Sequence, residues 1–203
     1  MFAQTQNELH NMKHMSILAV SLLALVACTP EKKQEADYSQ YVNPMIGTDF
    51  TGNTYPGAQV PFGMVQLSPD NGLPGWDRIS GYFYPDTTIA GFSHTHLSGT
   101  GAGDLYDISF MPVTRPYKEA PAPLGIYSTF SHNDEAASAG YYRVLLKDYN
   151  INVELTATER CGIQRYTFPE AEASVFLNLK KAMNWDFTLD SKIEVVDLSL
   201  IHI

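Results

Sequence analysis

The density of glycine and proline is the feature that most limits what this chain can fold into. The 203 residues include 14 glycines and 12 prolines. Proline removes a hydrogen bond from a helix interior, and glycine favours turns. Residues 41–70 carry four of the prolines, which excludes a long helix there: Pro44, Pro56, Pro61 and Pro69. The pattern favours short strands joined by many turns.

The clearest strand pattern lies in the second half of the chain. Residues 142–148 and 151–157 are apolar-rich segments joined by Tyr149 and Asn150, which predicts a β-hairpin. A short helical turn is expected at 131–137, capped by Ser131 or Asn133. Further strands are expected at residues 63–67, 104–113, 162–168, 174–179 and 192–196. Closely spaced strands without a long amphipathic helix indicate a mainly β fold, an antiparallel β-sandwich.

The charge balance excludes one class of partner. The formal net charge is −9, and the sequence has neither a basic stripe nor a phosphate-binding glycine motif. A nucleic-acid backbone would be repelled by such a chain, so we expect no nucleic acid partner.

Residues 1–27 have the pattern of a signal peptide. The apolar run at 17–27 follows Lys13 and is too short for a comfortable transmembrane helix. It ends at Leu25-Val26-Ala27-Cys28, which resembles a bacterial lipobox. We therefore expect lipidation of Cys28 and a lipid-anchored location in the bacterial cell envelope, either periplasmic or at the cell surface. A plain signal peptide and an uncleaved anchor are the alternatives.

The segments next to this signal need their own interpretation. Met12 or Met15 would be a more usual start, so residues 1–11 are interpreted as a misassigned beginning. Residues 28–40 are polar and predict a flexible tether between the lipid and a folded domain at 41–203. If Cys28 is lipidated, Cys161 has no partner within the chain, and no disulfide is expected.

A polar, glycine-dense stretch at residues 91–104 is the candidate for a binding loop. Phe92, His94 and His96 alternate, which predicts that they share one strand face, with Ser93 and Thr95 on the other. The glycines allow close approach of a ligand. A tight loop with structural histidines is the alternative. A zinc site at the two histidines lacks an evident third ligand.

The last residues lack the features of a domain end. Residues 197–203 form an apolar tail without a cap or a turn. This pattern predicts a sandwich truncated near Asp197. Because such a sandwich exposes strand edges and an apolar face, we expect poor stability.

Five segments in order carry a resemblance to a known family: VNPMIGT (42–48), YPGA (55–58), VPFGMVQLSPD (60–70), GFSHTHLSGTG (91–101) and LTAT (155–158). Over residues 41–197 the chain resembles glycoside hydrolase family 92, a family of calcium-dependent, inverting, exo-acting α-mannosidases. The resemblance implies an N-terminal β-sandwich of the supersandwich type. It also implies a following (α/α)6 toroid catalytic domain, which this chain lacks, with the substrate pocket between the two.

The resemblance also implies which residues contact substrate. Trp76 matches the tryptophan that faces the pocket and binds the sugar beyond the cleaved bond. Asp77, His94, His96 and Gly99 are expected near the pocket or the domain junction. The catalytic carboxylates and the calcium ligands belong chiefly to the missing domain, so neither a catalytic nor a metal-binding residue is assigned to this chain.

Two positions depart from the family pattern. Gln164 stands where a histidine is usual. Arg78 and Ile79 follow Trp76-Asp77 where small residues and often cysteine occur, which leaves the mannosidic linkage preference open.

Three functional hypotheses result. The first is an N-terminal, inactive fragment of an α-mannosidase, with mannose-containing glycans and the C-terminal catalytic domain of the same parent chain as partners. The second is a non-catalytic, glycan-binding surface lipoprotein. The third is a structural sandwich that binds no ligand.

Overall fold

The computed structural model describes residues 36–99, 105–121, 124–179, 188–197 and 200–202. The chain divides into two units, Met1–Asp37 and Tyr38–Ile203, and the fold described below is that of the second unit. Cys28, Gly101, Gly103 and the predicted signal peptide lie outside the described residues.

The first sheet has four antiparallel strands in the order β1-β3-β4-β12. Their bounds are β1 Ser68–Asp70, β3 Gly91–Ser93, β4 Ser109–Thr114 and β12 Ala173–Asn178. Phe92 pairs with Phe110 where β3 meets β4, and Phe110 pairs in turn with Leu177 of β12. The pairing of the short strands β1 and β3 places Asp70, at the end of β1, in the same sheet as Ser93, which directly precedes His94.

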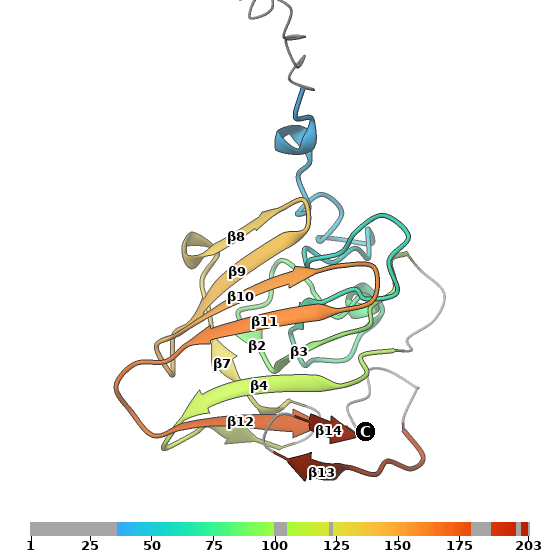
Figure 1. The fold of residues 1–203 in the computed structure, drawn as a ribbon. Coiled ribbons are helices and arrows are strands. Elements are labelled where there is room, and N and C mark those ends of the chain that lie inside the picture. The colour runs from blue at the N-terminus through green and yellow to red at the C-terminus, as the bar shows by residue number, and fades with distance from the viewer. Residues whose placement is uncertain (1–35, 100–104, 122–123, 180–187, 198–199, 203) are drawn as a thin grey trace, which may run out of the picture. The chain divides into compact units, whose positions relative to one another are not determined.

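The second sheet also has four antiparallel strands, in the order β11-β10-β9-β8. Figure 1 shows them side by side. Their bounds are β8 Glu135–Ser138, β9 Tyr141–Leu146, β10 Ile151–Ala157 and β11 Gly162–Thr167. Strands β9 and β10 form the predicted hairpin, and Asn150 in its turn has a φ of 52°. Asparagine tolerates this left-handed conformation better than most residues, which suits it to the turn.

Three two-stranded ribbons and three short 3-10 helices complete the described part of the chain. The ribbons pair β2 Thr88–Ile89 with β7 Ser128–Thr129, β5 Glu119–Ala120 with β6 Gly125–Ile126, and β13 Glu194–Asp197 with β14 Leu200–His202. The helices are η1 Ser39–Tyr41, η2 Trp76–Arg78 and η3 His132–Asp134. Among these described residues, none of the helices has the length and apolar character needed to span a membrane.

The core lies between the inward faces of the two sheets, which makes the fold a β-sandwich. One cluster of buried residues contains Phe92, Met111 and Val113 from the first sheet and Tyr142, Val144, Leu146, Ile151, Val153 and Leu155 from the second. In β10, burial alternates strictly from Ile151 to Ala157, as expected of a strand with one face in a core. Each large apolar side chain buried here contributes roughly 1.5–3 kcal/mol.

Several predicted elements are confirmed and two are wrong. The strands at 162–168, 174–179 and 192–196 are found as β11, β12 and β13. The helical turn expected at 131–137 is shorter, because residues 135–137 belong to strand β8; Ser131 caps it by accepting a hydrogen bond from the amide of Asn133. The strand predicted at 63–67 is not formed. Gln66 Nε2 donates to the Gly63 carbonyl, and pairing begins only with an isolated bridge at Leu67. The strand predicted at 104–113 begins later, at Ser109.

The sandwich is less closed at β11 than at its neighbour β10. Residues of β11 alternate between half-buried and exposed, and none is buried. Its inward side chains, Gln164 and Tyr166, bond to each other through the Tyr166 hydroxyl and Gln164 Oε1 at 2.6 Å. The buried Gln164 Nε2 has no hydrogen-bond partner. The expected low stability of the domain stays a prediction.

Candidate functional site: a histidine-braced loop surface

Strand β3 ends at Ser93, directly before the two histidines of the candidate loop. Beyond it the chain pairs irregularly with residues 106–107. The Tyr106 amide donates to the Thr95 carbonyl at 3.0 Å, and the His94 amide donates to the Asp107 carbonyl at 3.1 Å. Three residues on the partner segment have positive φ: Leu105 (78°), Tyr106 (67°) and Ile108 (54°). Bulky residues rarely adopt this conformation, and such strain concentrates at functional sites.

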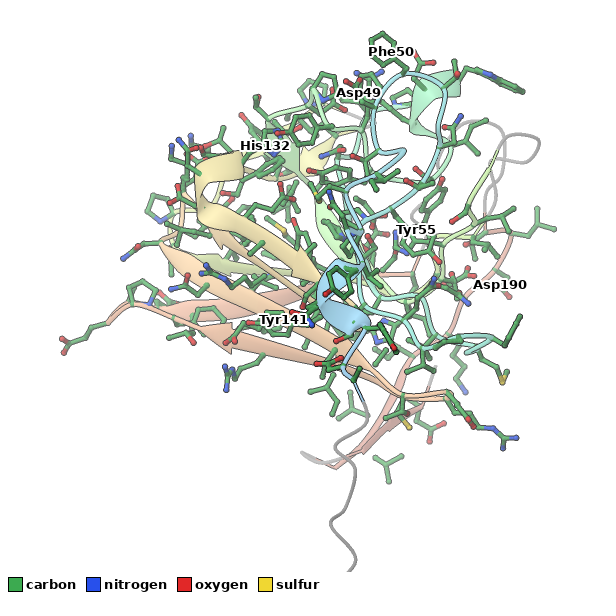
Figure 2. All side chains as sticks on the ribbon, turned by 90° about the horizontal axis from the view of Figure 1, so that it is seen from above. Asp49, Phe50, Tyr55, His132, Tyr141 and Asp190 are labelled. Atoms are coloured by element: carbon green, nitrogen blue, oxygen red, sulfur yellow. The ribbon has the colours of Figure 1, made fainter. Side chains whose placement is uncertain are left out.

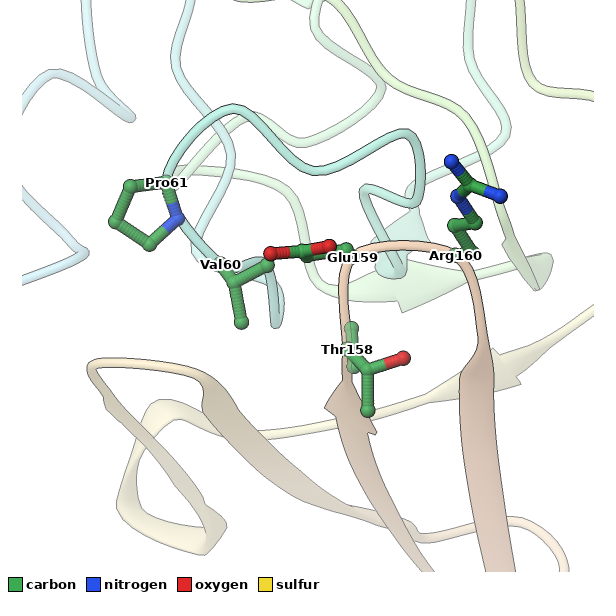
Figure 3. A pocket seen from close by; sticks show the side chains of 6 residues that line it. Val60, Pro61, Thr158, Glu159 and Arg160 are labelled. Carbon is green, nitrogen blue, oxygen red and sulfur yellow. The ribbon is translucent and has the colours of Figure 1, made fainter.

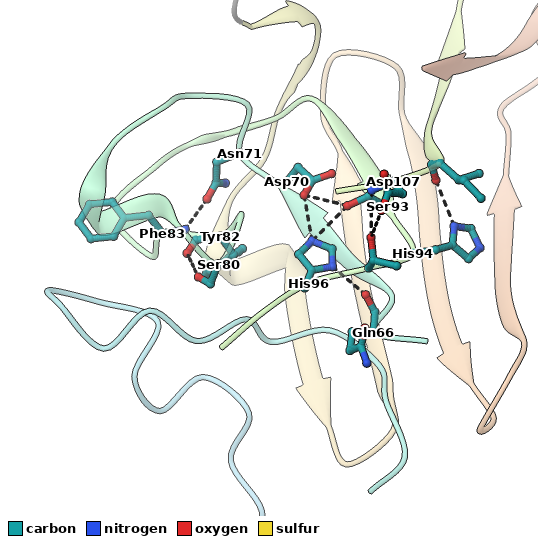
Figure 4. Close-up of polar contacts among 12 residues, drawn as sticks. Gln66, Asp70, Asn71, Ser80, Tyr82, Phe83, Ser93, His94, His96 and Asp107 are labelled. Atoms are coloured by element: carbon teal, nitrogen blue, oxygen red, sulfur yellow. Dashed lines mark hydrogen bonds and ion pairs between the residues drawn. The ribbon is translucent and has the colours of Figure 1, made fainter. Parts of the chain in front are cut away.

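His96 is buried and both of its ring nitrogens are engaged. Nδ1 lies 2.7 Å from the Gln66 carbonyl oxygen, and Nε2 lies 2.9 Å from Asp70 Oδ1 (Figure 4). A carbonyl oxygen can only accept, so Nδ1 carries a proton, and a second proton lies between Nε2 and the carboxyl group. The ring therefore joins the end of β1 to the loop after β3 as a buried, hydrogen-bonded pair.

Ser93 completes this buried group without forming a catalytic triad. Its hydroxyl donates to Asp70 Oδ1 at 3.1 Å and lies 3.3 Å from His96 Nε2. In a Ser-His-Asp triad the serine and the aspartate contact opposite ring nitrogens. Here both contact Nε2, and Ser93 is fully buried. The group braces the loop and offers no accessible nucleophile.

Gly81 leaves the space that this buried pair occupies. Its φ is +87°, and a Cβ at this position would lie 2.8 Å from Asp70 Oδ1 and 3.0 Å from His96 Cδ2. Only glycine combines that conformation with that close approach. Sequence reasoning did not single out Gly81. The available signal was its place directly before the aromatic run Tyr82-Phe83-Tyr84.

His94 is oriented differently from His96, so the expectation that both share one strand face is wrong. The strand ends before either residue. His94 Nδ1 lies 3.1 Å from the Ile108 carbonyl oxygen, and its ring meets the edge of Phe110 with centroids 5.6 Å apart. A Cβ on Gly162 would lie 2.9 Å from His94 Cδ2. Burial lowers the pKa of His94, with an opposing contribution from the Ile108 hydrogen bond.

Trp76 begins η2 and its side chain is 54% exposed. The segment after it is well fixed. Arg78 forms a two-pronged contact with Asp86, with Nε to Oδ2 at 2.7 Å and Nη2 to Oδ1 at 2.6 Å. The same guanidinium lies 4.5 Å from the centre of the Phe83 ring. An exposed indole on such a fixed segment is suited to cover the apolar face of a ligand. Asp77 is half-buried beside it.

Gly99 lies at the surface beside the loop at residues 47–54. Its amide donates to the Asn53 carbonyl at 2.7 Å. Its φ is +97°, and a Cβ there would meet no atom within 4 Å. Of the five predicted site residues, His96 alone is buried. The structure brings His96 together with Gly81 of the segment that carries Trp76.

A second buried group, around Glu135, was missed by sequence reasoning. The carboxylate accepts hydrogen bonds from the Tyr82 hydroxyl at 2.9 Å and the Tyr142 hydroxyl at 2.5 Å, and its Oε2 lies 2.7 Å from His132 Nδ1. His132 also stacks on Tyr84, with ring centroids 3.9 Å apart. These residues are distant in sequence, so no local pattern announces the group. It anchors the end of the Trp76 segment to the second sheet.

One depression among the described residues does not coincide with this surface. Its volume is about 610 Å3, and it lies between the loop at Val60 and Pro61 and the turn that joins β10 to β11 (Figure 3). Thr158, Glu159 and Arg160 of that turn form the opposite wall. None of the predicted site residues lines this depression, so we do not include it in the candidate site.

The described residues do not form a metal centre. No group of three or more His, Cys, Asp or Glu side chains among them is placed to hold an ion. Both ring nitrogens of His96 are already engaged. Cys161 is exposed, with a free thiol. Calcium takes oxygen ligands, and a cluster of three carboxylates that could supply them is not found among the described residues.

The antiparallel sandwich with its loop surface defines a mainly β domain, and comparisons with known proteins give its family. The profile of the glycosyl hydrolase family 92 N-terminal domain matches residues 41–202. This chain belongs to that family.

Solved structures of the family are similar to it. A family GH92 alpha-mannosidase from Bacteroides thetaiotaomicron, known alone and in complex with mannoimidazole, is 44% identical with a TM-score of 0.67, covering 71% of this chain and 20% of its own. A GH92 inverting mannosidase from the same organism is 31% identical with a TM-score of 0.58, over 71% of this chain and 20% of its own.

A curated relative is also matched over only about one fifth of its own length. An uncharacterized secreted glycosidase of Arthroderma benhamiae is 26% identical over 172 residues, which cover 80% of this chain and 21% of that protein. The chain thus spans about one fifth of the length of the relatives it matches.

Proposed function

We propose that this chain is the N-terminal sandwich domain of a longer, exo-acting α-mannosidase that releases terminal mannose from glycans with inversion. The observation that carries the proposal is the family match over residues 41–202. The names of the solved relatives support the mannosidase activity, and one of them is described as inverting. The mannoimidazole bound in another relative's structure supports a mannose-containing substrate.

In this proposal the domain contributes a wall of the substrate pocket and the interface to a C-terminal catalytic domain. Trp76 covers the apolar face of the sugar next to the scissile bond, since a flat indole sheds water from a pyranose. The buried Asp70–His96 pair and the Glu135 group hold the neighbouring loops in fixed positions. A preorganised wall of this kind binds with a smaller loss of conformational entropy.

We propose that the carboxyl groups that carry out catalysis lie outside this chain. An inverting glycosidase uses one carboxyl group as acid and another as base, spaced to admit a water molecule. We assign neither role to Asp70 or Glu135, because both side chains are buried and engaged. Calcium, if the intact enzyme needs it, would take ligands chiefly from the catalytic domain. The chain alone is therefore proposed to be inactive.

The parent protein is proposed to act at the bacterial cell envelope, anchored through a lipid on Cys28. The secreted curated relative supports a location outside the cytoplasm. Mass spectrometry of the membrane fraction tests the anchor. A diacylated or triacylated peptide beginning at Cys28 is expected, and an unmodified peptide that spans Ala27 and Cys28 would contradict it.

The activity is tested on the product of the complete gene. Purified protein should release mannose from α-linked mannobiosides when calcium is present, and Trp76→Ala should lower kcat/KM. Trp76→Phe should retain more activity than the alanine variant, because an aromatic face is kept. If the gene encodes no further domain, or its product releases no mannose from any α-mannobioside, the proposal fails.

A non-catalytic, glycan-binding lipoprotein is the second candidate. The half-exposed Trp76 on a fixed segment supports sugar binding under both candidates, so it keeps this second candidate in consideration. The two candidates predict different activities for the complete gene product. Saturable mannoside binding without any mannose release would favour the binding protein.

A further inference from the structure

Two exposed phenylalanines occupy a backbone conformation that bulky residues avoid. Phe50 has a φ of 50° and is 81% exposed, and Phe62 has a φ of 59° and is fully exposed. Neither gains burial in return for the strain. Strain of this kind persists where the surrounding structure enforces it, and it clusters at ligand-binding positions. The surroundings of the two residues show which of them is placed to bind.

The loop that presents Phe50 is closed at its neck. The Thr54 amide donates to the Gly47 carbonyl at 3.2 Å. A Cβ on Gly52 would lie 2.2 Å from that same carbonyl oxygen, so the two sides of the neck touch. At the tip, Asp49 Oδ1 accepts from the Phe50 amide at 2.7 Å. The aromatic ring is thus presented by a fixed loop.

The same loop is bonded to both segments that carry predicted substrate contacts. The Tyr84 amide donates to the Thr48 carbonyl at 2.8 Å, and the Ser80 hydroxyl donates to the Thr54 carbonyl at 3.0 Å. These bonds join the loop to the segment that begins with Trp76. On the other side, Gly99 is bonded to Asn53. Figure 2 shows Asp49 and Phe50 together at the tip of this loop, at the rim of the domain.

Phe62 has different neighbours and supplies a comparison within the same chain. Its turn is joined to the β10–β11 connection, where the Met64 amide donates to the Glu159 carbonyl at 2.7 Å. None of the predicted site residues lies on these segments. Phe50 and Phe62 are thus similar in exposure and backbone conformation. They differ in position, because only the Phe50 loop is bonded to the segment that begins with Trp76.

We propose that Phe50 and Asp49 form a further saccharide subsite, which binds a sugar unit more distant from the scissile bond than the unit that Trp76 covers. This inference rests on the proposed function. The phenyl ring covers the C–H face of a pyranose, while the Asp49 carboxylate accepts hydrogen bonds from its hydroxyls. A neutral saccharide suits a chain of net charge −9 better than an anionic ligand.

The residues around Phe50 favour a sugar over a protein surface. Asp49, Thr51 and Gly52 are all exposed and are polar or small. A protein interface core is depleted of charged groups and buries several apolar side chains together. A single aromatic ring among hydrogen-bonding groups is instead the arrangement that polar ligand sites use for orientation.

Calorimetric titration of the 203-residue chain with α-linked mannobiose and mannotetraose tests the subsite. Phe50→Ala should weaken mannotetraose binding about fivefold, in line with the free energy of an aromatic contact, and leave mannobiose binding within about twofold. Asp49→Asn should act in the same direction with a smaller effect. Phe62→Ala is the matched control and should change neither. Thermal melts verify that each variant is folded.

The outcomes separate this inference from the proposed function. If Trp76→Ala weakens mannobiose binding while Phe50→Ala and Phe62→Ala leave mannotetraose binding unchanged, the subsite is wrong and the proposed function stands. That result would assign Phe50 to contact with protein. Equal loss in both phenylalanine variants would also overturn the subsite. If neither saccharide binds the unaltered chain at millimolar concentration, the subsite is overturned, whereas the proposed function is decided separately by mannose release from the complete gene product.

Discussion

His96 Nε2 lies 2.9 Å from Asp70 Oδ1, and both side chains are completely buried. The pair connects the last residue of β1 to the loop after β3. Removal of one partner from a buried pair leaves an uncompensated polar group, which costs far more than the intact pair contributes. The position of the candidate loop therefore depends on this contact.

Asp70→Ala should lower the free energy of unfolding by about 3–5 kcal/mol, because it removes the carboxyl partner of the buried His96 ring. Urea denaturation measures the change. Glu154→Gln, which breaks the exposed bidentate contact with Arg165 on the outer face of the second sheet, is the control and should have a much smaller effect. Equal losses in the two variants would contradict the assigned importance of the buried pair.

Gly81→Ala should destabilise the domain more than Gly99→Ala. Both glycines have positive φ, so both variants suffer backbone strain of about 1 kcal/mol. Only the new Cβ at position 81 collides with Asp70 and His96. Comparison of their denaturation midpoints separates the collision from the strain. Equal decreases of the two midpoints would show that Gly81 is needed only for its positive φ and that the close approach to Asp70 and His96 is unimportant.

Acid should destabilise the domain partly through His94. Burial lowers the pKa of His94 in the folded protein below its usual value of 6.5. The unfolded chain then binds more protons than the folded one, so stability is present above pH 6.5 and is lost as pH falls toward the folded pKa. His94→Gln should flatten the pH dependence between pH 6.5 and 5. A His94 signal that titrates above pH 6.5 in NMR would contradict the assignment.

Glu135→Gln should cost about 2–3 kcal/mol, and Tyr142→Phe about 1 kcal/mol. The amide places its own donor against the hydrogens of Tyr82, Tyr142 and His132, whereas the phenylalanine removes only one donor from the group. Because the group anchors the Trp76 segment, the glutamine variant should also weaken mannoside binding. A glutamine variant as stable as the parent would contradict the importance assigned to this carboxylate.

The second sheet was predictable because its pattern is local. Burial alternates along β10, and the Tyr149-Asn150 turn lies between two apolar strands, so period and turn chemistry agree. The strand expected at 63–67 failed because the segment bonds to itself through Gln66 and to the turn at Glu159. Apolar content alone could not distinguish that arrangement from a strand.

The candidate site was only partly predictable from the sequence. The motif around His94 and His96 marked a loop whose substrate contacts stay a prediction, as does the substrate contact of the exposed Trp76. The different orientations of the two histidines could not be predicted, because their partners, Asp70 and the Ile108 carbonyl, are distant in sequence and meet them only on folding. The Glu135 group and Gly81 depend on such contacts entirely.

Sugar binding by Trp76 is tested by following its indole N–H signal in NMR while α-mannobiose is added to the chain. Trp76→Phe assigns the signal by its disappearance. We expect a saturable shift of the Trp76 signal at millimolar mannobiose, with no comparable shift in a titration with an equal concentration of a disaccharide that contains no mannose. A Trp76 signal that stays in place throughout, or that moves equally with both disaccharides, would contradict it.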